Sequence, residues 1–185
     1  MRITSSLVSG LALAACAVAV PVTTPSPEES IGGIAIGEIL NLLGVGLVTN
    51  ISTFITLDTL VDNLVSVDFT VKNPLPFELT IDSISTDAGV NNTVYASFSH
   101  TFPSDQKLVV PALGTASSGV FGNVILVQGA IASLDIIPLG YLDILNADAN
   151  LRLLTINGEL GIPLEVDGLK QSDVPATYSL DLTGS

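Results

Sequence analysis

The chain has 185 residues, of which 48% are hydrophobic and 12% charged, and its 18 acidic and 5 basic residues give a net charge of −13. This length is typical of one domain with a sizeable core. The acidic balance excludes polyanionic partners, because a phosphate backbone would be repelled, and we expect no nucleic-acid partner.

Residues 1–19 have the pattern of an export signal. Arg2 precedes an apolar run from Leu7 to Val18, which ends in small residues that fit a signal-peptidase site. Cleavage would also remove Cys16, the single cysteine, so we expect no disulfide bond. An alternative is that Leu13 to Cys16 is a bacterial lipobox, with Cys16 as the lipidated residue. Both interpretations predict export: we expect a secreted protein, with a vacuolar, membrane-associated or wall-associated location as the alternative.

Two segments lie between the signal and the predicted domain. Residues 20–30 contain three prolines among Thr, Ser and Glu, which indicates an extended linker. Residues 31–48 are nearly all apolar, and we expect them to be helical and packed on the domain. The apolar face of that helix would consist of Ile36, Ile39, Leu40, Leu43 and Leu47. Contact with a membrane through 31–48 is the alternative, against which the charge of Glu38 counts.

Residues 49–185 carry the alternation of a β domain, and its clearest part is Val65 to Lys72. There the inward residues are Val65, Val67, Phe69 and Val71, and polar residues stand between them. A second strand follows with Phe77, Leu79 and Ile81 inward. The connection contains Asn73, Pro74 and Pro76. We expect it to be a stiff structural corner, because the prolines favour extended backbone and Asn73 can bond to nearby backbone. An exposed Leu75 would offer an alternative role, as a contact for a partner.

The remaining elements also follow mainly from alternation. Residues 50–59 and 94–99 predict strands, 108–111 predicts a short edge strand, and residues near 130–134 predict a helix that ends at Pro138. Within 141–156 the apolar parity changes, which predicts a bulge. Asn157-Gly158 predicts a tight hairpin, and its partner strand would place Leu160, Ile162, Leu164 and Val166 inward. A last strand covers 176–182. This pattern predicts an all-β fold, an Ig/fibronectin-III-like antiparallel β-sandwich of seven to eight strands with one or two short helices.

The corner also carries a family resemblance. Val67 to Phe77 resembles the strand-Asn-Pro-x-Pro-Phe signature of the late-embryogenesis-abundant type 2 family, also called the water-stress and hypersensitive-response domain. With the leader and the ending Leu169 to Tyr178, the chain is similar to the uncharacterised fungal secreted and vacuolar branch of that family, over roughly residues 47–183. The resemblance implies a sandwich of about seven strands with a helix at one end, and no catalytic residues.

Few residues are candidates for chemistry. His100, the only histidine, is predicted to face inward at a strand end as a structural residue. Without a second histidine or a mature cysteine, the usual zinc and copper ligand sets are excluded. Asp143 and Asp148 could serve as an acid pair or bind calcium, but such acids are more typical of a solvated face. We expect no catalytic residue, metal site or cofactor.

Two sequons, Asn50-Ile51-Ser52 and Asn91-Asn92-Thr93, predict glycosylation at Asn50 and Asn91. Together with the signal peptide they fit a eukaryotic secretory route. We therefore expect a secreted, non-enzymatic protein that binds an apolar ligand such as a lipid, or a protein partner, through residues that the sequence does not identify. The alternative is a cell-surface or wall-associated stress-protective protein that acts through hydration and charge. An enzyme is a third class, which would depend on His100.

Overall fold

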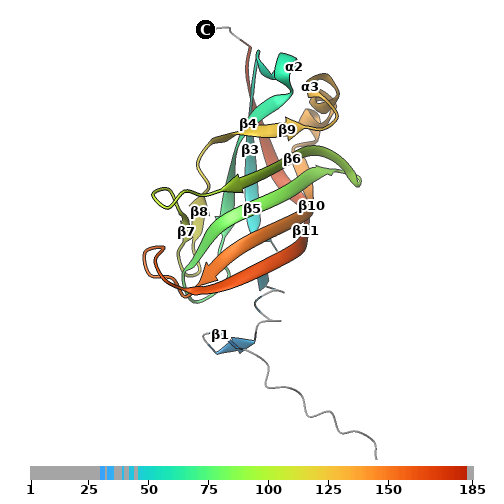
Figure 1. Ribbon diagram of the computed structural model, residues 1–185. Coiled ribbons are helices and arrows are strands. Elements are labelled where there is room, and N and C mark those ends of the chain that lie inside the picture. Colours follow the sequence, from blue (N-terminus) through green and yellow to red (C-terminus); the bar gives the residue numbers. More distant parts are fainter. Residues whose placement is uncertain (1–29, 32, 36–38, 40–41, 44–45, 183–185) are drawn as a thin grey trace, which may run out of the picture.

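The computed structural model describes residues 30–31, 33–35, 39, 42–43 and 46–182, and most of them belong to a closed β-barrel (Figure 1). The barrel strands are β3 (Val48–Thr56), β4 (Leu64–Lys72), β5 (Leu79–Val90), β6 (Thr93–Thr101), β9 (Phe121–Leu126), β10 (Tyr141–Leu153) and β11 (Ile162–Asp181). Two short strands, β7 (Leu108–Val110) and β8 (Thr115–Ser117), pair with β5 and β4 outside the ring. The helices α2 (Thr59–Asp62) and α3 (Ala130–Ser133) and the 3-10 helix η1 (Leu134–Leu139) lie together at one end, which we call the cap end.

The barrel is one sheet closed on itself, in the order β10-β11-β3-β4-β9-β6-β5 and back to β10. Closure depends on the antiparallel pair β5–β10, whose register runs from Asp143 opposite Gly89 to Leu153 opposite Leu79. The all-β prediction is therefore confirmed, but the Ig-like sandwich was wrong. Alternation shows only that one face of each strand is buried, and a closed sheet and two facing sheets both satisfy that condition.

The seam between β11 and β3 is the parallel contact in this otherwise antiparallel ring. β11 first pairs with β10 and then continues beside β3, with Ala176 opposite Ile51 and Asp181 opposite Thr56. Nearer the start of β3, the side chain of Gln171 takes the place of backbone pairing between β11 and β3. The Val48 amide donates to Gln171 Oε1 at 3.1 Å, and Gln171 Nε2 donates to the Val48 carbonyl. One continuous 20-residue strand thus takes the place of the two separate strands that the sequence predicts at 160–166 and 176–182.

The inner faces of the first strands agree with the predicted alternation. On β4 the predicted inward residues are all buried, and they are Val65, Val67, Phe69 and Val71. On β10 the buried parity changes between Ile144 and Ala147, where the pairing with β11 is also shifted, so the predicted bulge is confirmed. The Asn157-Gly158 turn is also confirmed, because both residues have positive φ (52° and 73°) and Ile156 and Glu159 exchange backbone hydrogen bonds. The strand after it begins later than predicted: Leu160 is 78% exposed.

The corner at residues 73–76 carries the chain from β4 to β5, which are not neighbours in the ring. Asn73 is completely buried, and its Nδ2 donates to the carbonyls of Phe77 (2.8 Å), Val110 (3.2 Å) and Pro111 (3.1 Å). Its Oδ1 accepts from the Leu75 amide at 2.9 Å. One amide side chain therefore ties together the corner, β7 and the loop that follows β7.

Leu75 is not the exposed contact point that one interpretation of the sequence required. It is 0% exposed, and its carbonyl accepts a hydrogen bond from the Leu113 amide at 3.0 Å. The residue lies inside the corner because Asn73 holds its amide and the loop after β7 covers it.

The segment 31–48 is described only in part. Ser30–Ile31 (β1) and Ile34–Ala35 (β2) form a short antiparallel pair, so a helix does not begin at residue 31. Residues 39 and 42–43 have helical backbone, and the side chains of Ile39, Leu43 and Leu47 are buried against the barrel core. The signal peptide, Cys16, most of the linker and the other predicted face residues, Ile36 and Leu40, lie outside the described residues.

The barrel interior is packed differently at its two ends. At the end near the corner the interior is lined by large aliphatic side chains, and Leu79, Ile81, Leu151 and Leu153 are at most 1% exposed. At the cap end the wall includes smaller residues such as Thr86 and Ala88 on β5. The hollow half of the barrel therefore lies beneath α2, α3 and η1.

Candidate functional site

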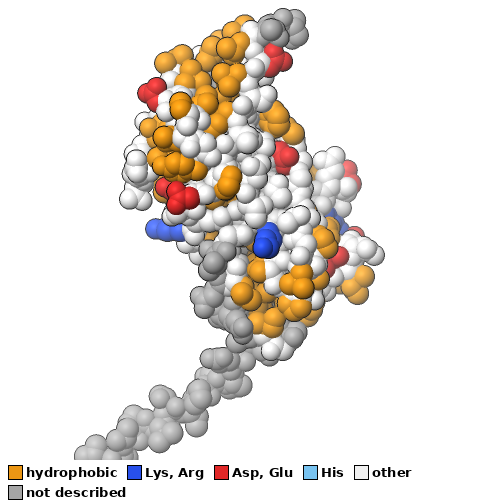
Figure 2. Space-filling view, turned by 180° about the vertical axis from the view of Figure 1, so that it is seen from behind, with side chains coloured by type: hydrophobic (Ala, Val, Ile, Leu, Met, Phe, Trp, Pro, Cys, Tyr) orange, Lys and Arg blue, Asp and Glu red, His pale blue; other side chains and the backbone are white. Residues whose placement is uncertain are grey.

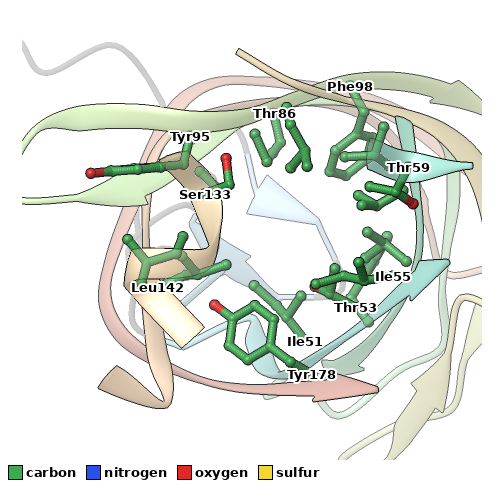
Figure 3. A pocket seen from close by; sticks show the side chains of 18 of the residues that line it. Ile51, Thr53, Ile55, Thr59, Thr86, Tyr95, Phe98, Ser133, Leu142 and Tyr178 are labelled. Carbon is green, nitrogen blue, oxygen red and sulfur yellow. The ribbon is translucent and has the colours of Figure 1, made fainter. Parts of the chain in front are cut away.

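A cavity occupies the cap half of the barrel (Figure 3). Its volume is about 60 Å³, and one water needs roughly 10–15 Å³ of such space. Every barrel strand contributes to the wall, for example through Ile55 (β3), Val67 (β4), Thr86 (β5), Phe98 (β6), Val124 (β9), Leu142 (β10) and Tyr178 (β11). The space therefore suits a small organic group or several waters.

The cavity exists because small side chains face each other across its wall. Ala88 on β5 is directly opposite Ala96 on β6, and both line the cavity. In the cap, Ala130 and Ser133 contribute further short side chains. Since protein interiors are normally packed to crystal-like density, such a cluster leaves room that neighbouring strands do not fill.

The cap is held in place by one asparagine. Asn63, with φ of 59°, ends α2 in the left-handed conformation. Its side-chain oxygen accepts from the Ala130 amide at 2.7 Å, and its carbonyl accepts from the Leu126 amide at 2.9 Å. The end of α2, the start of α3 and strand β9 are thereby fixed relative to one another above the cavity.

Two hydroxyl groups of the cavity wall have partners in the protein. Thr59 Oγ1 accepts from the Thr56 amide at 3.1 Å, and Ser133 Oγ donates to the Gly129 carbonyl at 2.8 Å. These side chains stabilise the cap from within, so their hydroxyls are not free for other molecules.

Two other hydroxyl groups of the wall have no partner in the part of the chain that the structure describes, namely Thr86 Oγ1 and Tyr178 Oη, and both atoms are buried. Thr86 is 7% exposed, and Figure 3 shows it across the hollow from Tyr178. Leaving a buried polar group unpaired costs about 1–3 kcal/mol. Such a cost is expected to be offset by a water or a ligand.

Tyr178 is also a neutral group at any ordinary pH. Burial raises the pKa of Tyr178 to about 12, because the phenolate would be poorly solvated among aliphatic side chains. Its oxygen therefore carries a proton and can donate a hydrogen bond throughout the neutral range. No side chain among the described residues that line the cavity carries a charge.

The surface around the cap is rich in apolar side chains. Figure 2 shows hydrophobic side chains gathered at this end of the molecule. The exposed residues of this rim are Leu57, Val61, Ile125, Val127, Ile131, Leu139, Leu180 and Leu182. Exposed Asp58, Asp62 and Asp135 stand among these residues, so an apolar molecule would approach a mainly hydrophobic rim that carries some negative charge.

A second, smaller hollow adjoins the cavity, and Ile84 and Thr86 line both of them. It offers about 30 Å³ on the same measure and is bounded by Leu43 and Leu47. These two residues belong to the apolar segment that the sequence places before the barrel. The segment thus covers the barrel away from the cap.

His100 lies on β6, half-buried, with its ring stacked on Phe121 at 4.4 Å and edge-on to Phe102 at 4.7 Å between centroids. The cavity is not lined by His100. Among the described residues, no group of three His, Cys, Asp or Glu side chains is placed to hold a metal ion.

We expect acid to destabilise the protein through His100. Burial lowers its pKa below the ordinary value of about 6.5, so the folded state binds the proton less readily than the unfolded chain. The free energy of unfolding is therefore highest above the pKa that His100 has in the unfolded chain. It decreases as the pH falls from that pKa toward the lower pKa of the folded state. Between about pH 7.5 and about pH 5, the melting temperature of the wild type should fall more than that of His100→Gln. Parallel curves would contradict this assignment, since the carboxylates titrate alike in both proteins.

Asp143 and Asp148 do not form a site together. Asp143 Oδ1 accepts from the Asp173 amide at 2.9 Å, and Asp148 Oδ1 accepts from the Gly168 amide at 2.8 Å. Asp173 and Gly168 are both positive-φ residues of β11. The two carboxylates therefore satisfy backbone groups where β11 departs from regular strand geometry.

The predicted glycosylation residues lie in different settings. Asn91 is exposed in the turn between β5 and β6, whereas Asn50 is half-buried on β3 with its Nδ2 bonded to Ser52 Oγ at 3.2 Å. The sequence analysis missed Thr86 and placed Tyr178 only within the strand that it predicts at 176–182. The signal that could have found them is a hydroxyl-bearing residue at an inward position of a strand.

Fold and site together define a closed all-β barrel with an apolar cavity under a helical cap. No protein-family model matches the sequence. No curated protein matches it either. The chain is similar to a solved structure described as a crystal structure of a protein from Archaeoglobus fulgidus, with 8% identity, 57% of this chain and 81% of that chain covered, and a TM-score of 0.28. So low a score supports no argument about function. Within the described residues, no helix is long and apolar enough to cross a membrane.

Proposed function

We propose that this protein is a non-enzymatic carrier or receptor that holds an apolar ligand in the cap half of its barrel. The observation that carries the proposal is the pair of buried, unpaired hydroxyls of Thr86 and Tyr178 in a largely apolar cavity. Ligand sites are typically apolar hollows with a few convergent polar groups. The apolar rim around the cap supports the same proposal, because it provides a surface that an apolar molecule can approach.

The size of the cavity bears on how a ligand would be held. About 60 Å³ is room for a short group, so a long chain must continue beyond the cavity or widen it. The helices α2 and α3 have four residues each and are tied to one another through Asn63, so a longer ligand would have to displace them together. We therefore propose that one end of the ligand enters beneath the cap and the remainder lies along the apolar rim.

We also propose that the chain is an exported member of the late-embryogenesis-abundant type 2 family. Support comes from the corner motif Val67 to Phe77 and from the signal-like residues 1–19. N-terminal sequencing of protein recovered from the medium should find a start near Val20. Absence of the protein from the medium, with an intact leader on the protein retained in the cells, would contradict the export proposal.

The binding proposal is tested by filling the cavity. Titration of the full chain with the neutral fluorophore N-phenyl-1-naphthylamine should show saturable fluorescence enhancement. Replacing Ala88, a 5% exposed wall residue, with leucine should weaken binding by about tenfold, or about 1.4 kcal/mol, because the new side chain occupies the hollow. The melting temperature should stay level or rise, as it does when cavities are filled.

The matched control is Ala112→Leu, which makes the same change at an exposed position after β7. It should bind the fluorophore like the wild type. Two results would contradict the proposal: no saturable binding by the wild type, or an Ala88→Leu variant that is folded and binds as well as the wild type.

A further inference from the structure

We infer that the ligand presents an uncharged hydroxyl or carbonyl oxygen to Thr86 and Tyr178, so that its class is a neutral alcohol or ketone with an apolar body rather than a carboxylate, an amine or a phosphate. The inference rests on the proposed function and specifies the chemistry of the same cavity. It starts from the two fully buried polar atoms of the described wall that have no partner, Thr86 Oγ1 on β5 and Tyr178 Oη on β11.

The two hydroxyls determine which ligand groups are complementary. Each can donate one hydrogen bond and also accept one. A ligand hydroxyl can donate to one of them while accepting from the other, and a carbonyl can accept from either. Figure 3 shows Tyr178 with its oxygen turned into the hollow, whereas the oxygen of Tyr95 points away from it. Tyr95 therefore lines the cavity without offering it a polar group.

Charge excludes the other classes of apolar ligand. A fatty acid, an alkylamine or a phosphate ester would bring a full charge into a wall that has no charged side chain among its described residues. Burying such a charge without a partner is far less favourable than burying a neutral polar group. Arg152 is held by Asp82 at 2.6 Å, and Lys107 by Glu159 at 2.6 Å. Lys170 lines the smaller hollow, which Thr86 also borders, and does not line the cavity.

The neutral state of Tyr178 agrees with this assignment. Because burial raises the pKa of Tyr178 to about 12, its oxygen remains a donor throughout the neutral range. A carbonyl or hydroxyl oxygen is the acceptor that such a donor lacks within the described part of the chain. A bound water is the competing occupant, and the experiment must separate the two.

Three probes of equal chain length provide the test: 1-octanol, octanoate and octylammonium, each titrated against the full chain by calorimetry. Octanol should bind at least about tenfold more tightly than either charged probe. Thr86→Val and Tyr178→Phe remove one hydroxyl each and nearly preserve shape. Each should weaken octanol binding by about three- to tenfold, the usual worth of a hydrogen bond, while the ligand-free variants melt at or above the wild-type temperature, because an unpaired buried group has been removed.

Two variants of other wall residues serve as controls. Tyr95→Phe should leave octanol affinity unchanged, since its hydroxyl faces away from the cavity. Thr59→Val removes a hydroxyl that is already bonded to the Thr56 amide and should lower the melting temperature.

The outcomes distinguish this inference from the proposed function. If neither the fluorophore nor any octyl probe binds, the proposed function fails. If the probes bind but octanoate binds as tightly as octanol, or Thr86→Val and Tyr178→Phe keep full octanol affinity, the cavity binds apolar molecules and the present inference is wrong. A lower melting temperature of both ligand-free variants with unchanged octanol affinity would show that water holds the hydroxyls, which also overturns it.

Discussion

Replacing Asn73 with aspartate (Asn73→Asp) should lower the free energy of unfolding by about 4 kcal/mol at pH 7. The side chain is 0% exposed, and its Nδ2 faces the carbonyl oxygens of Phe77, Val110 and Pro111 at 2.8–3.2 Å. A carboxylate there would lose three donated hydrogen bonds and bring a negative charge against three carbonyl oxygens. Urea unfolding of the variant and the wild type measures the effect.

The same variant has a specific pH dependence. Burial and the surrounding carbonyls would raise the pKa of the introduced carboxyl above its ordinary value of about 3.9. Because a raised carboxyl pKa means that the folded state favours the proton, the penalty is full above the folded pKa and decreases as the pH falls through it. The difference from the wild type should therefore narrow between neutral pH and about pH 4.

Asn150→Asp is the matched control. Asn150 is exposed on β10, and its Nδ2 donates to Ser83 Oγ at 2.9 Å. The serine hydroxyl can reverse and donate to a carboxylate, so this variant should stay within about 0.5 kcal/mol of the wild type. Equal stability of the two variants would refute the role of Asn73 as the polar centre of the corner.

Gly89→Ala should be the second large effect, with a loss of about 3 kcal/mol or more. A Cβ built on Gly89 would lie 1.9 Å from the Thr93 carbonyl oxygen and 2.8 Å from its carbon, which are backbone atoms with little freedom to move. Gly89 pairs with Val94 on one side and with Asp143 on the other, where the barrel closes. The methyl group would therefore push β6 away from β5 at the point where β5 also pairs with β10.

Gly122→Ala provides the comparison on β9. A Cβ there would meet Ser66 Oγ at 3.6 Å, an ordinary contact, so the variant should be as stable as the wild type or slightly more stable. Thermal melting followed by circular dichroism measures both variants. If Gly89→Ala melts within about 2 °C of Gly122→Ala, the close approach of β5 and β6 at Gly89 does not require a glycine there.

The individual strands could be predicted because their signals are local. On β4 the alternation identified every buried residue, and Asn157-Gly158 marked its turn, since the conformations involved depend on one or two neighbouring residues. Leu75 was harder: whether it is exposed depends on a loop nearly 40 residues later in the chain, whose Leu113 amide binds its carbonyl at 3.0 Å. Leu160 was assigned to the strand because it continues the alternation of apolar residues. Its backbone, with φ of 57°, is not in a strand conformation.

The candidate site could not be predicted from any one segment. Thr86 and Tyr178 are 92 positions apart in the numbering, and each occurs in an ordinary alternating strand. What makes them a pair is the closure of β5 on β10 and the continuation of β11 beside β3. The cavity likewise depends on Ala88 meeting Ala96 across a register that is shifted by a bulge.

The sequence by itself determined that this chain forms strands, which side of most of them is buried, and that an asparagine-proline corner joins two of them, because period-2 patterning and proline stereochemistry act over a few residues. Tertiary structure alone decided that the strands close into a barrel instead of a sandwich, that one half of the barrel interior is hollow, and that two hydroxyls in this hollow have no partner among the described residues. Those features depend on strand order and on which side chains meet across the interior, and the same alternating pattern is compatible with several such arrangements.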